Sequence, residues 1–191
     1  AKGAVIKNSI IMQDSVRDAF MISLKRLGYS CNTTDEDELN EAMEELKIQS
    51  KLNKAYTIDE VRDKMINGAA AIGVIYSGEY LYCQEENEDL EYVIPKEGTN
   101  LFFDAVCIPK IKEDTEESRL KKLASEMYIN FLNEPEIAAA NIEYIQYSTP
   151  NDAALQLLDE EVRNNPISYP SDEVLENTQV YVNLSEETNL Y

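Results

Sequence analysis

The sequence predicts an α/β fold, because short apolar runs of strand length alternate with segments that carry helix-start signals. Ala69–Tyr76 is an apolar run long enough for one buried strand, and Ala105–Ile108 is a shorter run bounded by a proline. The pattern of Ser or Thr followed three residues later by Asp or Glu opens three helical segments, at Ser15, Thr34 and Thr57. Strands that alternate with helices in this way are typical of a largely parallel or mixed sheet.

The elements follow in order along the chain. Lys7–Met12 predicts a strand, and Ser15 and Asp18 predict a capping box for a helix that ends at Gly28. The sequence then predicts helices opening at 34 and 57, a strand at 69–76, a helix at 80–88, strands at 91–95 and 105–108, helices at 115–132, from 135, at 152–158 and at 160–164, and a tail with one short helix and an extended piece at 179–182. The buried side of the 115–132 helix is expected to carry Leu120, Leu123, Ala124, Met127, Tyr128 and Phe131.

The charge of the chain restricts its partners. The 191 residues contain 37 acidic and 17 basic side chains, so the formal net charge is −20. A field of this sign repels nucleic acid and anionic lipid and attracts cations, so we expect a cationic partner and no nucleic acid. The sequence has no His, which is the commonest general base and metal ligand, and its three cysteines match no zinc or redox spacing.

Candidate ligand groups gather where the predicted strands end, as they do in open α/β sheets. Four such exits carry acids, aromatic rings or both: Asp14–Asp18, Tyr76–Glu79, Phe102–Asp104 and Tyr147 with its neighbours. Carboxylates and flat rings together suit an amine, because the acids meet its charge and the rings contact its carbon stem. A cation–π contact contributes about 0.5 to 2 kcal/mol.

Each candidate also has a purely structural interpretation. Asp18 could be the capping-box acid, and Asp14 could favour the positive end of the helix that follows it. Asp104 could cap a turn, and Glu79 could be a solvated turn residue. Tyr76 and Phe102 could be ordinary core or rim aromatics. Asp104 is the strongest ligand candidate, because it follows two aromatics and precedes the predicted buried strand at 105–108.

Motifs for other chemistry do not occur. The sequence has no glycine-rich phosphate loop, GxSxG elbow, HExxH motif or DxDxDG calcium loop. We therefore expect neither an enzyme nor a resident cofactor or metal.

Motifs spread over residues 7–191 resemble one family. They are Asp14–Phe20, Leu24–Ser30, Ile75–Gly78, Pro95–Gly98, Phe102–Asp104, Ile129–Leu132 and Tyr147–Asn151. Together they resemble the bacterial spermidine/putrescine-binding proteins that feed ABC importers. The resemblance implies a type II periplasmic-binding fold whose two lobes close on a polyamine without chemistry, and which delivers it to the importer's permease subunits. It also implies a location at the periplasmic or extracellular face of the membrane, with peripheral association through the permease or through a lipid anchor outside this chain.

The resemblance assigns roles to individual positions. It makes Asp18 and Asp104 the carboxylates that meet ammonium groups. The aromatic walls would be Tyr76, Phe102 and Tyr147, of which the first two often stand as Trp in the family. A second family acid falls at the position of Ser15, next to Asp14. Glu79 stands where putrescine-selective relatives carry an acid, and Tyr181 lies near a polar contact of the terminal segment.

The same resemblance divides the chain. Residues 1–6 match nothing, 7–99 and 155–191 belong to the second lobe, and 100–154 cross into the first. Because members of the family carry most of the first lobe before this point, we expect the chain to be a C-terminal fragment whose crossing segment exposes apolar surface. Two alternatives stay open: a binding protein for another cationic or small polar solute, and an acidic interaction domain without a small-molecule site.

Overall fold

The computed structural model describes residues 6–190, so nearly all of the segment 1–6 lies outside the described residues. The chain forms two compact units. One contains the chain up to Phe102 together with the segment from Pro170 onward, and the other is Phe103–Tyr169.

The first unit is built on a parallel three-stranded sheet in the order β2-β1-β3. Its strands are β1 (Ile10–Gln13), β2 (Asn53–Thr57) and β3 (Ile72–Gly73). All four residues of β1 are buried, as expected of a central strand covered on both faces. The parallel sheet confirms the prediction made from the alternation of strands and helices.

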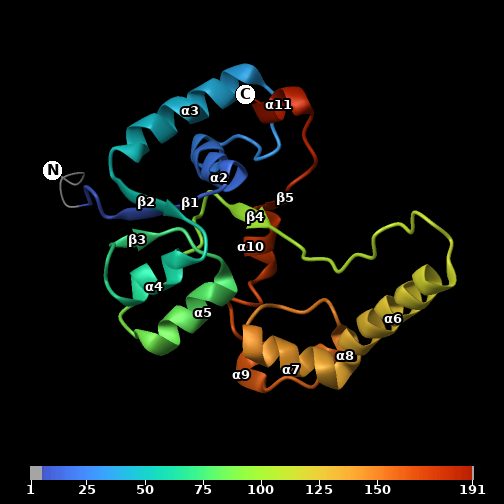
Figure 1. Cartoon of the computed structure of the whole chain (residues 1–191). Helices are drawn as coiled ribbons and strands as arrows, with labels where there is room; N and C mark the ends of the chain where they lie inside the picture. The colour runs from blue at the N-terminus through green and yellow to red at the C-terminus, as the bar shows by residue number, and fades with distance from the viewer. Residues whose placement is uncertain (1–5, 191) are drawn as a thin grey trace. The chain divides into compact units, whose positions relative to one another are not determined.

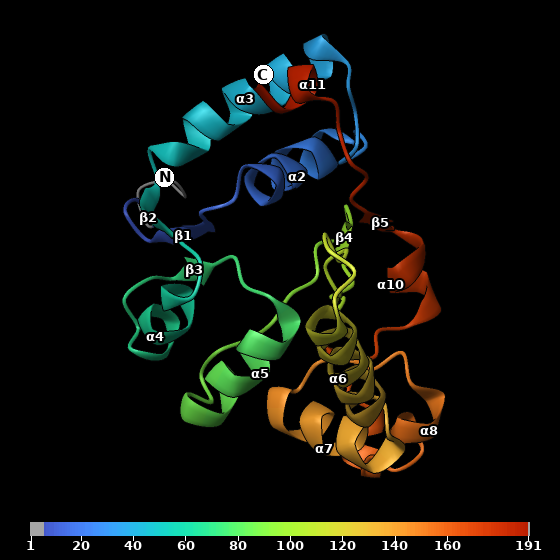
Figure 2. The ribbon, with the colours of Figure 1, turned by 45° about the vertical axis from the view of Figure 1, so that its right-hand side comes forward.

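Helices cover both faces of this sheet. Helices α2 (Val16–Leu27) and α3 (Glu36–Ser50) connect β1 to β2, and α4 (Glu60–Ile66) connects β2 to β3. The two connections step across the sheet in opposite directions, so right-handed crossovers place their helices on opposite faces. Figures 1 and 2 show α2 and α3 on one side of the strands, and α4 and α5 (Ser77–Glu86) on the other.

The helix ends follow the sequence signals only in part. Ser15 caps α2 and Gly28 ends it in the left-handed conformation at φ 87°, which confirms both predictions. Helix α3 is capped by Asp35 in place of the predicted Thr34, because the Asp35 carboxylate accepts hydrogen bonds from the backbone N–H groups of Asp37 and Glu38. Helix α4 begins after Asp59, since Thr57 is used as the last residue of β2.

The C-terminal segment returns to the first unit. Strand β5 (Thr178–Val180) pairs in parallel with β4 (Thr99–Leu101), flanked by α10 (Asp172–Glu176) and α11 (Glu186–Leu190). Gly98 enters this pair with φ 100°, and a Cβ at that position would lie 2.1 Å from the carbonyl oxygen of Asn177.

The second unit is helical. It contains α6 (Glu116–Leu132), α7 (Pro135–Ile145), α8 (Asp152–Leu155) and α9 (Glu160–Arg163). Its buried cluster lies between α7 and the segment that follows it and consists of Ala139, Ile142, Ala154 and Leu158.

Two predictions for the second unit are wrong. Residues 105–108 form no strand and are mostly exposed, and no residue of α6 is buried although one face of it was expected to be. Leu120 is 59% exposed and Met127 is 63% exposed. The physical reason is that an apolar run or stripe becomes buried only where another element packs closely over it, whereas residues 106–108 and α6 line an open groove together.

The short strands of the first unit also differ from those predicted from the sequence. Of the predicted strand at 69–76 only Ile72–Gly73 pairs with β1, and residues 91–95 form no strand. Strands β2 and β4 were not predicted. Both depend on a partner strand distant in the sequence, and neither has the apolar alternation that marks a half-buried strand.

Candidate functional site

Asp18 lies in the first turn of α2 and is almost completely buried, with 7% of its surface exposed. Its backbone N–H donates to the Ser15 side-chain oxygen over 3.4 Å, which is half of the predicted capping box. The other half, a bond from the Ser15 N–H to the Asp18 carboxylate, is replaced by contacts to distant residues. The Asp18 carboxylate therefore does not cap its own helix and instead binds residues from other segments.

Two phenols meet this carboxylate. The Tyr76 hydroxyl donates to Asp18 Oδ2 over 3.0 Å, and the Tyr181 hydroxyl donates to Oδ1 over 2.8 Å. Burial raises the pKa of Tyr181 above its ordinary value, and the hydrogen bond to Asp18 raises that pKa further. Tyr181 is therefore a neutral donor at any physiological pH. Three segments converge here: the start of α2, the N-cap of α5 and the residue after β5.

The charge of Asp18 is not cancelled by an ion pair. Among the described residues, the carboxylates that form ion pairs with Lys or Arg are others. Neutral O–H donors stabilise a carboxylate without removing its negative field, and each oxygen keeps a further lone pair. A cation that reaches Asp18 would therefore meet an uncompensated charge in a largely desolvated position, where an electrostatic interaction is stronger than in water.

An aromatic pair stands beside this acid. The rings of Tyr76 and Phe102 make an edge-to-face contact with centroids 5.3 Å apart and planes at 64°. Phe102 directly follows β4 and is 38% exposed. Tyr76 thus joins the acid to the ring pair, since its hydroxyl binds Asp18 and its ring packs against Phe102.

Arg17 was not identified from the sequence, yet it supports the site. Its guanidinium lies 4.6 Å from the centroid of the Tyr181 ring, and it donates to the carbonyl oxygen of Val182 over 3.2 Å and to Asn32 Oδ1 over 3.0 Å. These contacts hold the segment after β5 against α2, which keeps Tyr181 within reach of Asp18. Position 17 carries no sequence signal for this role, because Tyr181 and Val182 lie more than 160 residues away and Asn32 lies in the loop after α2.

The remaining candidates of the first unit have other partners. Glu79, in the first turn of α5, accepts a hydrogen bond from Arg62 Nη1 over 3.3 Å. Asp14 is exposed, and its backbone N–H donates to the Thr57 carbonyl oxygen. Ser15 uses its hydroxyl oxygen as the N-cap acceptor of α2. Of the predicted set, the structure brings together Asp18, Tyr76, Phe102 and Tyr181.

Two predicted site residues belong to the second unit. Asp104 lies in an exposed loop, and Tyr147 is half-buried just after α7. Because residues 105–108 form no buried strand, the argument that placed Asp104 at the mouth of one does not hold. The assignment of Asp104 as a ligand carboxylate stays a prediction from the family resemblance.

Other features of the described residues suit a polyamine less well. Residues 6–190 contain no group of three or more Cys, Asp or Glu side chains that could hold a metal ion. A groove of about 380 Å³ in the second unit carries no acid and is lined by Val106, Cys107, Ile108, Ala124, Ser125, Tyr128 and Ile129.

No helix in the described part of the chain has both the length and the apolar character needed to span a bilayer.

The fold agrees with what comparison with known proteins shows. A family model described as bacterial extracellular solute-binding protein matches residues 1–170. The chain belongs to this family, which confirms the resemblance and the fold class inferred from the motifs.

Individual relatives make the likeness more specific. A spermidine/putrescine-binding periplasmic protein of Salmonella typhimurium is 37% identical over 164 residues, 86% of this chain and 45% of that protein. The solved structure assigned to a spermidine/putrescine ABC transporter of Listeria monocytogenes is 38% identical, with a TM-score of 0.86 over 98% of this chain and 56% of that one. The substrate-binding protein PotD of Streptococcus pneumoniae is 37% identical, with a TM-score of 0.79 over 96% of this chain and 55% of that one. The chain spans about half the length of the curated relatives it matches.

Proposed function

We propose that this chain is part of the substrate-binding component of an ABC importer, which captures a polyamine such as spermidine or putrescine and delivers it to a membrane permease. The names of the relatives support this function. So does the net charge of −20, which favours a cationic solute over an anionic one. The protein would act at the periplasmic or extracellular face of the membrane, as a binding protein without enzymatic activity or cofactor.

The observation that carries this proposal is the environment of Asp18. Its buried carboxylate receives two neutral phenol donors and forms no ion pair among the described residues. A ligand ammonium can supply the missing positive charge, and a charged hydrogen bond of this kind contributes about 1.5 to 3 kcal/mol. The methylene stem of a polyamine would then lie against the Tyr76 and Phe102 rings, which offer apolar and cation–π contact.

The division into lobes is part of the same proposal. Residues 7–99 and 155–191 would form one lobe, and residues 100–154 would cross into the other. Asp104 and Tyr147 would then contribute a second carboxylate and a further ring from the crossing segment. Closure of the lobes would enclose the ligand between the two sets of residues.

Calorimetric titration with spermidine and putrescine tests the function, using the protein in its full natural length. We expect Asp18→Asn and Asp104→Asn each to weaken binding by at least about 1.5 kcal/mol, a factor of roughly ten or more. Asp14→Asn is the matched control, because it removes the same charge from an exposed position just before α2. Its effect should stay within about twofold. Absence of binding at millimolar polyamine would refute the proposal.

A thermal-shift panel separates the polyamine from other solutes. Amino acids, sugars and divalent metal ions are compared with the polyamines at equal concentration, because only a true ligand stabilises the folded state by mass action. Stabilisation by another cationic or polar solute alone would change the ligand but keep the binding function. Stabilisation by no solute would favour an acidic interaction domain.

A further inference from the structure

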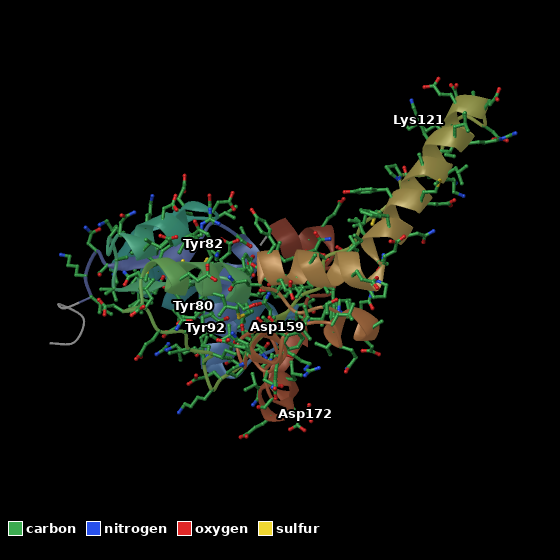
Figure 3. All side chains as sticks on the ribbon, turned by 90° about the horizontal axis from the view of Figure 1, so that it is seen from below. Tyr80, Tyr82, Tyr92, Lys121, Asp159 and Asp172 are labelled. Carbon is green, nitrogen blue, oxygen red and sulfur yellow. The ribbon has the colours of Figure 1, made fainter. Side chains whose placement is uncertain are left out.

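Arg62 is held on one face of α5 by two side chains that lie one turn apart. Its Nη1 is 3.3 Å from Glu79 Oε2, and its Cζ lies 4.6 Å from the centroid of the Tyr82 ring. Figure 3 shows Tyr82 on this helix. Residues three apart are neighbours on a helix surface, so Glu79 and Tyr82 together form a seat for the guanidinium, which comes from α4.

Glu79 also lies one helical turn from Tyr76, which belongs to the Asp18 site. Tyr76 is the N-cap of α5 and Glu79 is the third residue of that helix. Residues three apart are neighbours at the start of a helix, so Glu79 lies within one turn of the residue whose ring contacts Phe102 and whose hydroxyl binds Asp18.

We propose that Arg62 is a specificity-determining residue, which occupies Glu79 as an internal cation and so withholds this carboxylate from the ligand. The inference rests on the proposed function. It makes Asp18 and Glu79 unequal as ligand acids. Asp18 offers an uncompensated charge to an ammonium group, whereas Glu79 is already neutralised. A polyamine that places an ammonium group near Glu79 must displace Arg62 or accept its repulsion.

Replacing Arg62 alone should be enough to free the Glu79 carboxylate. The Arg62 and Glu79 side chains are 38% and 36% exposed, so their mutual attraction is modest and screened by salt. Removing Arg62 would therefore cost the fold little, while it would leave the Glu79 carboxylate without its cation. The expected result is a gain of affinity, which a merely structural role for Arg62 would not produce.

The test is calorimetric titration of the full-length protein with spermidine or putrescine, whichever the wild type binds more tightly, at low and at physiological ionic strength. We expect Arg62→Gln to bind about fivefold more tightly at low salt, with a smaller gain at higher salt. Arg62→Gln combined with Glu79→Gln should return to within about twofold of the wild type, because the freed carboxylate is then gone. Arg62→Lys, which keeps the charge, should also stay near the wild type.

Controls separate this mechanism from others. Arg26→Gln removes one positive charge from the ion pair with Glu45 on α2 and α3, so it matches the change in net charge without touching the site. It should leave affinity unchanged. A gain in Arg26→Gln, a gain that persists when Glu79 is also replaced, or no gain in Arg62→Gln with an unchanged melting temperature would each overturn the inference. A wild type that binds no polyamine would instead refute the proposed function.

Discussion

Replacing Tyr181 with Phe removes one of the two donors to the buried carboxylate of Asp18 and leaves the rest of the local packing in place. The ring keeps its place beside the Arg17 guanidinium, and Tyr76 still donates to Asp18 Oδ2. What is lost is the O–H bond of 2.8 Å to Oδ1. In the unfolded chain, water satisfies both the carboxylate and the phenol, so the cost of the change falls on the folded state.

The size of this cost follows from the type of bond. A hydrogen bond to a charged group contributes about 1.5 to 3 kcal/mol, and removal of one partner leaves part of the carboxylate unsatisfied. Because Tyr181 is only partly buried, water can replace some of the lost bond. We therefore expect Tyr181→Phe to lower the free energy of unfolding by about 1.5 kcal/mol near pH 8.

The pH dependence gives a second and more specific expectation. The pKa of Tyr181 is raised in the folded state, first by burial and then by Asp18. Below pH 10 the phenol is protonated in both states, and its contribution to stability is complete. Above pH 10 the unfolded phenol ionises while the folded one does not, so stability falls by up to about 1.4 kcal/mol per pH unit. The Phe variant lacks this loss, so the difference between the two proteins should shrink between pH 10 and 11.

Urea denaturation followed by circular dichroism at pH 8, 10 and 11 measures both effects. Tyr29→Phe is the matched control at pH 8, because it removes a similar phenol-to-carboxylate bond, of 2.6 Å to Glu41, at the surface. It should cost less than Tyr181→Phe. Equal losses in the two variants, or a difference between wild type and Tyr181→Phe that stays constant from pH 8 to 11, would refute the reasoning.

Two further predictions concern a turn and the thiols. Gly98→Ala should destabilise the protein by about 2 to 4 kcal/mol in urea denaturation, because the added Cβ meets the Asn177 carbonyl oxygen. Gly28→Ala, which has a similar positive φ but open space around it, should cost only about 1 kcal/mol, and equal losses would contradict this argument. In the native protein a thiol reagent should modify exposed Cys107 rapidly at pH 8. Cys83 should react only on unfolding, since burial raises its pKa to about 11; fast reaction there would contradict the packing of α5.

Local sequence signals were reliable where the interaction itself is local. Ser15 and Gly28 were predicted as the ends of α2, and both cap it, because the partners of a helix end lie within one turn. Where two residues could cap a helix, the sequence did not indicate which one does. Asp35 caps α3 in place of Thr34, and Thr57 belongs to a strand whose partner lies more than forty residues away.

The candidate site was predictable as a set of residues but not as a set of contacts. Asp18, Tyr76 and Tyr181 were each identified, yet the two hydrogen bonds that join them span 58 and 163 residues. Arg62 was missed for the same reason: nothing at position 62 indicates that its partner is Glu79 on the next helix. For Asp104 the sequence argument itself was wrong, because the strand expected at residues 105–108 did not form.

The sequence by itself determined the strongly anionic character of the chain, the alternation of strands and helices, and the family motifs, all of which depend on composition and on spacing along the chain. Only the tertiary structure decided that Asp18 accepts hydrogen bonds from two phenols while Glu79 forms an ion pair with Arg62. The reason is physical. The field at a carboxylate depends on which distant side chains packing brings within a few ångströms, and two acids that look alike in the sequence can therefore have different chemistry.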